Sequence, residues 1–89
     1  MIALVYTASF LKSAKNLPKS QAIKLAGLLG ILQQKPFHLK LHTKNLTGSL
    51  TGFYSFRITR DWRVIFQFLA PEKIKLIIIG HRKDIYQKF

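Results

Sequence analysis

Hydrophobic positions follow different periods in the two halves of the chain. Residues 2–6 form a short, mostly apolar run without helix-starting residues, which predicts a buried strand. Thr7 or Ser9 then offers a side-chain oxygen as the N-cap of a short helix that ends near residue 16. Apolar residues at i, i+4 and i+7 from Phe10 share one face of this segment, so we expect it to pack on a core.

A second helix is predicted from Pro18 to about Gln34. Proline suits the first turn of a helix, where its missing N–H costs nothing, and Pro36 prevents continuation at the other end. The apolar residues of this segment form a broad face that comprises Ala22, Ile23, Leu25, Ala26, Leu28, Leu29 and Leu32. We therefore expect two helices that cover an apolar surface supplied by the rest of the chain.

Residues 35–51 show neither period and predict a long basic loop. Proline, glycine, lysine and histidine interrupt it repeatedly, while Leu39, Leu41 and Leu46 are expected to hold it against the core. Loops of this length in a small domain are often functional.

The last third of the chain predicts an antiparallel meander with turns at residues 59–61 and 71–73. Alternation places Phe53, Ser55 and Arg57 on one side of the first strand. On the second strand, one face carries Trp62, Val64, Phe66 and Phe68, and the other face carries Arg63, Ile65 and Gln67. In the third strand it groups Lys75, Ile77, Ile79 and His81. Both faces are partly apolar, so we expect helices on one face and the tail or a partner on the other. The prediction is an α+β fold of order β-α-α-β-β-β, with a mostly antiparallel sheet, two N-terminal helices and a short C-terminal tail.

Size and composition favour a single domain over residues 1–89. A chain of 89 residues is too short to build two cores, and its mean hydropathy of +0.12 favours a packed core over disorder. We expect a cytoplasmic protein without a membrane partner, because no apolar run is long enough to cross a bilayer and no signal peptide is visible. There is no cysteine, so stability has to come from packing without disulfides.

Charge is the strongest feature of the composition. Fifteen Lys and Arg residues against three Asp and Glu give a formal net charge of +12. Such a balance favours binding to polyanions and steers their association. Nucleic acid is the leading candidate ligand, and an acidic protein partner could use the same field.

The scarcity of acids narrows the possible chemistry. The three acids, Asp61, Glu72 and Asp84, stand apart in the sequence, so paired-carboxylate and two-metal mechanisms are not expected. The three histidines are not spaced for a zinc site, and no Gly-rich phosphate loop is present. We expect neither a metal nor another cofactor. Metal-free cleavage of RNA remains, because the 2′-OH is an internal nucleophile that an enzyme only has to orient and deprotonate.

Arginines within the strands are the candidate phosphate ligands. Arg63 lies in mid-strand, where its guanidinium can be held toward a scissile phosphate, although a solvent-facing arginine would fit the same position. Arg57 is a supporting candidate, with an ion pair to Asp61 as the alternative. We assign Trp62 and the phenylalanines to the core and not to base stacking.

The tail supplies the remaining candidates. Arg82 follows the last strand beside His81, and a salt bridge with Asp84 competes with phosphate contact as its role. His81 and Tyr86 are candidates for proton transfer, with ring burial as the alternative for Tyr86.

Three segments together resemble one family. They are Leu-Thr-Gly-Ser-Leu-Thr-Gly-Phe-Tyr-Ser-Phe-Arg-Ile at 46–58, Asp-Trp-Arg-Val-Ile-Phe at 61–66, and Ile-Ile-Ile-Gly-His-Arg-Lys-Asp-Ile-Tyr at 77–86. In this order, and with the strand and helical pair before them, they resemble the RelE/ParE superfamily of toxin–antitoxin toxins over essentially the whole chain. The resemblance implies a cytoplasmic toxin that a cognate acidic antitoxin wraps and neutralises.

RelE-like members cut mRNA in the ribosomal A site without a metal. The resemblance assigns transition-state stabilisation to Arg63 and Arg82, and matches Tyr86 and His81 to tail positions of the family. The basic residues ahead of the meander, Lys40, His42 and Lys44, correspond by position in a loop and are expected to hold the RNA backbone. The tail lacks a terminal His-Tyr pair, so the general acid and base are not assigned.

Two other functions fit the same sequence. A ParE-like toxin shares the fold but inhibits DNA gyrase by binding protein. A non-catalytic basic RNA-binding module would use the charge without cleavage. The set of Arg63, His81, Arg82 and Tyr86 favours the nuclease.

Overall fold

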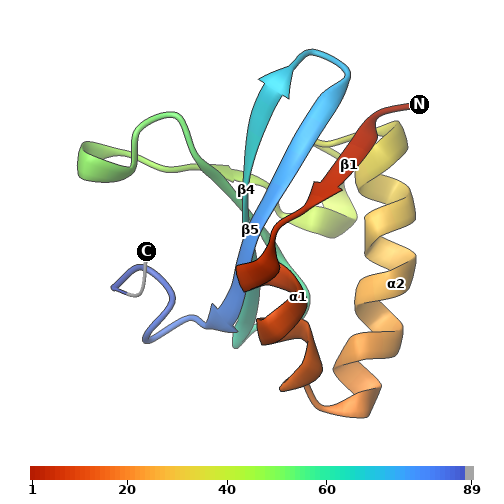
Figure 1. Cartoon of the computed structure of the whole chain (residues 1–89), viewed down its shortest axis with the longest axis vertical. Helices are drawn as coiled ribbons and strands as arrows, with labels where there is room; N and C mark the ends of the chain where they lie inside the picture. Colours follow the sequence, from red (N-terminus) through yellow and green to blue (C-terminus); the bar gives the residue numbers. More distant parts are fainter. Residues whose placement is uncertain (88–89) are drawn as a thin grey trace.

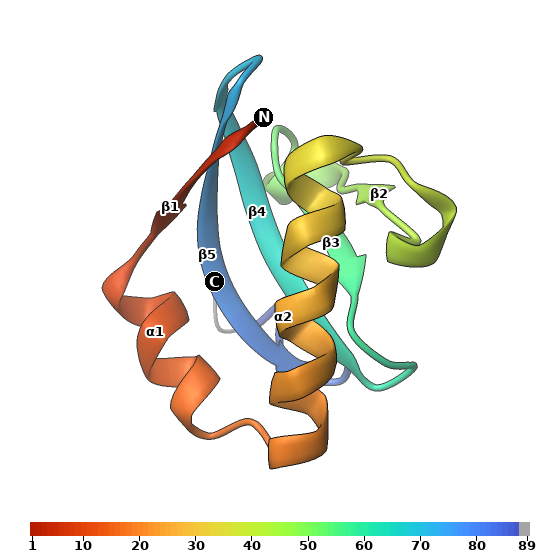
Figure 2. The same ribbon diagram turned by 90° about the vertical axis from the view of Figure 1, so that its right-hand side faces the viewer.

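A computed structural model describes residues 1–87 and has one mixed sheet covered on one face by two helices (Figures 1 and 2). The elements are β1 (Ala3–Tyr6), α1 (Ala8–Lys15), α2 (Lys19–Gln34), η1 (Leu39–Leu41), β2 (Lys44–Asn45), η2 (Gly48–Leu50), β3 (Tyr54–Arg57), β4 (Trp62–Ala70) and β5 (Lys73–His81). The predicted α+β class and element order are confirmed, and the two-residue strand β2 is an addition inside the basic loop. No helix in the described part of the chain is long and apolar enough to cross a membrane.

The strand order is β1-β5-β4-β3-β2, and only the β1–β5 pair is parallel. Thr7 joins β1 to α1, and its hydroxyl has two roles. Its Oγ1 donates to the carbonyl of Leu76 at 2.8 Å and accepts from the backbone N–H of Phe10 at 3.0 Å. Thr7, and not Ser9, is therefore the N-cap of α1, and it ties the start of the helix to β5.

Helix α1 lies beside the part of β5 that β1 does not reach. β1 pairs with β5 only from Lys73 to Leu76, so the edge of β5 beyond Leu76 has no strand beside it. Ser13 on α1 accepts the backbone N–H of Ile79 at 3.0 Å. A side chain thus satisfies an edge donor that would otherwise invite another strand.

The main core lies between the helices and the sheet. It is formed by Phe10, Leu17, Leu25, Leu28, Leu32, Leu41, Phe56, Ile58, Val64, Phe66, Ile74, Leu76 and Ile79. The expected apolar face of α2 is only partly used, because Leu25, Leu28 and Leu32 are buried whereas Ile23 is 67% exposed. The apolar residues of α2 are distributed around its whole circumference, and only the stripe that faces the sheet is buried.

The basic loop is held as expected at Leu41 and Leu46, which are 0% and 7% exposed. The expectation for Leu39 is wrong, since it is 88% exposed. Leu39 and Leu41 belong to one 3₁₀ turn, where about three residues complete a turn and positions two apart point in different directions. Only one of the two can reach the core.

The opposite face of the sheet, here named the tail face, is covered by the C-terminal tail and the η2 region (Figure 1). Ile85 of the tail is fully buried with Leu46 and Ile65. The meander turns are confirmed, but the grouping of Ile77 with Ile79 and His81 is wrong. A register shift moves the partners from Ile65↔Ile78 to Phe66↔Leu76, so Ile77 is an extra residue on β5. Ile77 and Ile78 both pack in the tail-face cluster, and Ile79 packs with the helices.

Gly80→Ala is expected to destabilise the protein. A Cβ at Gly80 would lie 3.2 Å from the Cβ and Cγ1 of Ile85, which has no room to withdraw because it is fully buried. Overpacking of this kind costs about 1–3 kcal/mol. Gly30→Ala is the control, because its Cβ would meet nothing within 4 Å, and the helix should gain about 0.5–1 kcal/mol. Urea denaturation measures both, and a Gly80→Ala variant as stable as the parent would contradict this account of the tail.

Candidate functional site

Two arginines face each other across neighbouring strands on the tail face. Arg57 on β3 is the direct cross-strand partner of Arg63 on β4. Their neighbours Phe56 and Val64 pack in the helix-side core, so alternation directs both arginines to the opposite face. Directly opposed side chains have Cβ atoms about 4.5–5.5 Å apart, and like charges in such a pair repel each other. The pair therefore concentrates two positive charges on rigid strands.

The inner donors of this pair lack protein acceptors. The Nε atoms of Arg57 and Arg63 are buried and have no hydrogen-bond partner among the described residues. A buried donor without an acceptor costs about 1–3 kcal/mol. Planar guanidinium groups match the oxygens of a phosphate in a bidentate manner. An anion bound here would satisfy the donors and relieve the repulsion.

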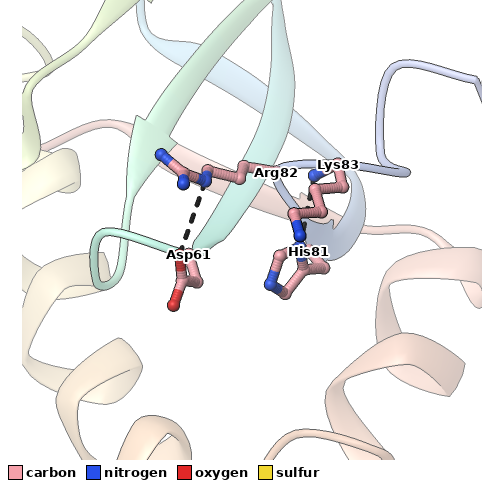
Figure 3. A network of polar contacts seen from close by, with 4 residues as sticks. All are labelled: Asp61, His81, Arg82 and Lys83. Carbon is pink, nitrogen blue, oxygen red and sulfur yellow. Dashed lines mark hydrogen bonds and ion pairs between the residues drawn. The ribbon is translucent and has the colours of Figure 1, made fainter.

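The three acids of the chain do not compensate the pair. Asp61, in the β3–β4 turn, forms an ion pair with Arg82, with 3.5 Å between Oδ1 and Nε (Figure 3). Glu72 lies in the β4–β5 turn at the other end of the sheet, and Asp84 lines a hollow beside α1. The alternatives of an Arg57–Asp61 pair and an Arg82–Asp84 pair are thus replaced by an Arg82–Asp61 pair. This contact is weak, because both side chains are about half exposed.

Arg82 continues the edge of β5 next to the arginine pair. Its backbone N–H donates to the carbonyl of Asp61 at 2.7 Å, which extends the β4–β5 ladder by one step. Arg63 is opposite Gly80 in that ladder, two positions earlier. Arg82 therefore follows the strand end at which Arg63 lies, and its exposed side chain is free to exchange Asp61 for another anion.

Tyr86 and Lys44 reach the tail face from opposite sides. Tyr86 packs beside Ile85 and Ile65, and it shares a hollow of about 260 Å³ with Lys44, Leu46 and the η2 region. Lys44 on β2 pairs with Ser55 on β3, two residues from Arg57 along the same face. The structure brings Lys44, Arg57, Arg63 and Tyr86 to one side of the sheet.

His81 lies on the other side. It is the cross-strand partner of Trp62, and the two rings make an edge contact with centroids 5.8 Å apart. Both line a hollow of about 190 Å³ with Ser13 of α1 and Asn16, the C-cap of that helix. His81 Nδ1 accepts the backbone N–H of Lys83 at 3.2 Å, which helps turn the chain into the tail (Figure 3). The bulge in β5 thus separates His81 from Arg63.

The remaining predicted residues lie in the loop before β2. Lys40 belongs to η1, and His42 adopts a left-handed conformation with φ 49° that directs the chain from η1 toward β2. Both side chains are exposed. Neither is part of the arginine pair.

Sequence reasoning missed two features of the site. The direct pairing of Arg57 with Arg63 depends on the β3–β4 register. The Ile58 N–H donates to the Trp62 carbonyl across the turn, and counting one residue outward on each strand from this pair would have suggested that Arg57 and Arg63 are opposed. Ser55 is 1% exposed on the same face and supplies a small side chain between Lys44 and Arg57. Residues 1–87 contain no group of three or more His, Cys, Asp or Glu side chains that could hold a metal ion.

No protein-family model and no curated protein sequence matches the chain. Its fold does match solved structures. YafQ from Escherichia coli has a TM-score of 0.79 at 20% identity, over 97% of this chain and 99% of YafQ. A YoeB/ParE toxin from Agrobacterium tumefaciens matches with a TM-score of 0.77 at 20% identity, over 91% of this chain and 99% of that toxin. A chain of the RelE–RelB complex from Pyrococcus horikoshii matches with a TM-score of 0.76 at 24% identity, over 93% of this chain and 97% of that chain. The fold of the RelE/ParE toxins is therefore confirmed for this chain.

Inorganic phosphate is expected to stabilise the protein through the arginine pair. At one hundred times its dissociation constant a ligand adds about 2.7 kcal/mol, and Arg57→Met or Arg63→Met should lose most of this gain. Each variant should also be more stable than the parent without phosphate, because cross-strand repulsion of about 0.2–1 kcal/mol disappears. Thermal unfolding at constant ionic strength measures both effects. Arg60→Met, an exposed turn arginine, serves as the control, and an equal phosphate response in all four proteins would contradict the anion site.

Proposed function

We propose that this chain is the toxin component of a type II toxin–antitoxin system, acting as a metal-independent, ribosome-dependent endoribonuclease that cleaves mRNA and arrests translation in the cytoplasm. The observation that carries the proposal is the Arg57–Arg63 pair, whose buried Nε donors have no acceptor within residues 1–87. The likeness of the whole fold to RelE and to a YoeB/ParE toxin supports it. Dependence on the ribosome is part of the same proposal and is inferred from this likeness of fold.

The reaction needs no metal ion, because RNA carries its own nucleophile. The 2′-oxygen attacks the adjacent phosphorus and loses its proton, while the bond from phosphorus to the 5′-oxygen breaks and that oxygen gains a proton. The products are a cyclic phosphate and a free 5′-hydroxyl. Charge accumulates on the phosphoryl oxygens in the transition state, where preorganised guanidinium donors are most effective.

Each residue of the tail face has a role in this scheme. Arg63 and Arg57 hold the phosphoryl oxygens from two rigid strands, and Arg82 joins them on leaving Asp61. Tyr86 offers a hydroxyl on the same face, so we assign it to proton transfer in preference to His81, which faces α1. Lys44, with Lys40 and His42 beside it, holds the RNA backbone.

A cognate acidic antitoxin is the proposed protein partner. A net charge of +12 attracts an acidic polypeptide over long range at low salt. The archaeal RelE with a similar fold is itself in a complex with RelB. An acidic segment laid over the tail face would supply carboxylates to Arg57 and Arg63 and exclude RNA.

Arg63→Ala is expected to abolish mRNA cleavage and growth arrest without unfolding the protein. Removing one preorganised donor to a developing oxyanion typically lowers the rate about 10²–10³-fold. Primer extension on mRNA bound to ribosomes measures cleavage, with Arg60→Ala as the matched control. Full activity in Arg63→Ala would remove Arg63 from the mechanism.

Gyrase inhibition separates the nuclease from a ParE-like toxin. The proposal expects ribosome-dependent mRNA cleavage and no effect on DNA supercoiling. Inhibition of supercoiling without RNA products would replace it with the ParE-like function. Tight RNA binding without products or gyrase inhibition would identify a non-catalytic RNA-binding module.

A further inference from the structure

Phe37 is an aromatic side chain on the surface of the basic loop. It is 63% exposed, which contradicts the assignment of all phenylalanines to the core. Its ring is nearly parallel to that of Phe68, with centroids 6.2 Å apart and an interplanar angle of 20°. It also makes an edge contact with the ring of Tyr54, with centroids 5.9 Å apart and an interplanar angle of 77°. The protein thus supports one side of the ring and leaves a flat apolar surface toward solvent.

The loop holds Phe37 in a defined position. Pro36 restricts the backbone just before it, and the Thr43 hydroxyl donates to the Pro36 carbonyl across the loop. Leu41 is fully buried and anchors the following turn in the main core. A ligand that stacks on Phe37 therefore meets a preorganised ring, and little conformational entropy is lost on binding.

Basic residues flank Phe37 in the sequence. The neighbouring basic side chains along the loop and β2 are Lys35, His38, Lys40, His42 and Lys44. No acid occurs anywhere between residues 35 and 60. An exposed aromatic ring within a cationic segment is the combination that binds single-stranded nucleic acid, because the bases stack and the phosphates meet the positive charge.

Phe37 and the arginine pair lie on different faces of the sheet, joined by its β2–β3 edge. The rings that Phe37 contacts, Tyr54 and Phe68, pack against the helix-side core. Lys44 lies on the edge strand β2 and faces the same side as Arg57. Figure 2 shows the loop between α2 and β2 beside this edge of the sheet. A strand of RNA that passes around β2 can contact both Phe37 and the tail face.

We propose that Phe37 is a stacking platform for an unpaired RNA base, and that the basic side chains of residues 35–44 hold the adjoining phosphates. The site lies outside the cleavage face and would anchor RNA a few nucleotides away from the scissile bond. The choice of RNA over DNA rests on the proposed function. The stacking itself rests on the geometry of Phe37.

A protein partner is the competing occupant of this surface. Leu39 is 88% exposed two residues from Phe37, and a protein interface would use both apolar side chains. A base would use only Phe37, since an aliphatic side chain offers no aromatic face. The cations and the absence of acids in the loop favour nucleic acid, and the pair of side chains supplies a direct test.

The test measures binding of a fluorescent single-stranded RNA with 2′-O-methyl riboses, which cannot be cleaved because the nucleophile is blocked. Phe37→Ala should weaken binding about 5- to 150-fold, the range for loss of one stacked base. Phe37→Trp should retain binding. Phe37→Leu preserves apolar contact with Phe68 but removes the aromatic face, so it should weaken binding while thermal unfolding stays close to that of the parent.

Leu39→Ala is the matched control and should change binding less than twofold. An oligonucleotide of the same length without bases should bind the parent and Phe37→Ala equally, because it has nothing to stack. Unchanged RNA binding in Phe37→Leu, or an equal loss in Leu39→Ala, would overturn the stacking site.

The outcome is separable from that of the proposed function. Cleavage that depends on Arg63 while Phe37→Leu binds RNA as the parent does would leave the nuclease and reject the platform. Binding that depends on Phe37, together with no cleavage on the ribosome, would leave the platform and reject the nuclease.

Discussion

One irregularity in the β4–β5 ladder determines how side chains are distributed between the two faces of the sheet. Ile77 is an extra residue on β5, so the alternation after it is reversed relative to the residues before it. Gly80 consequently lies under Ile85, and His81 packs against Trp62 on the side of α1. With regular alternation His81 would stand on the tail face, and a bulky isoleucine would compete for the place of the tail. The position of Tyr86 depends on the same shift, because Ile85 anchors the segment that carries it.

The two faces of the sheet contribute to stability in opposite ways. The helix side buries a continuous set of apolar side chains. On the edge of β5, Thr7 donates to the Leu76 carbonyl and Ser13 accepts from the Ile79 N–H. The tail side has a smaller apolar cluster, and two arginines carry buried donors without acceptors. Functional groups often violate the rules that the rest of a chain obeys, and the surrounding fold compensates. Here the helix-side core compensates for a cationic pair that the tail side alone would not stabilise.

Local signals predicted most of the fold, and long-range geometry accounts for the differences. The Thr7 cap, the helix limits near Pro18 and Pro36, and both meander turns depend on residues close in sequence, and each is found in the structure. The bulge at Ile77 depends on how β5 fits both β4 and the tail, and no residue in β5 marks it. The exposure of Phe37 and Leu39 was missed for a similar reason. Leu39 is oriented by a short 3₁₀ turn, and Phe37 lies in the turn before it, where Thr43 is bonded to Pro36 across the loop. For the site, residue types and strand positions were predictable, whereas the opposition of Arg57 and Arg63 and the orientation of His81 required the register.

The parallel pairing of β1 with β5 has a consequence for when the protein can fold. Thr7 and its partner Leu76 are 69 residues apart in the sequence. At about 5–20 residues per second, synthesis needs roughly 3 to 14 seconds to reach Leu76 after Thr7 has been added. β5 lies between β1 and β4, so the sheet that carries the arginine pair is complete only after residues 73–81 have been made. Parallel pairing of the first and last strands thus makes completion of the sheet a late event in synthesis.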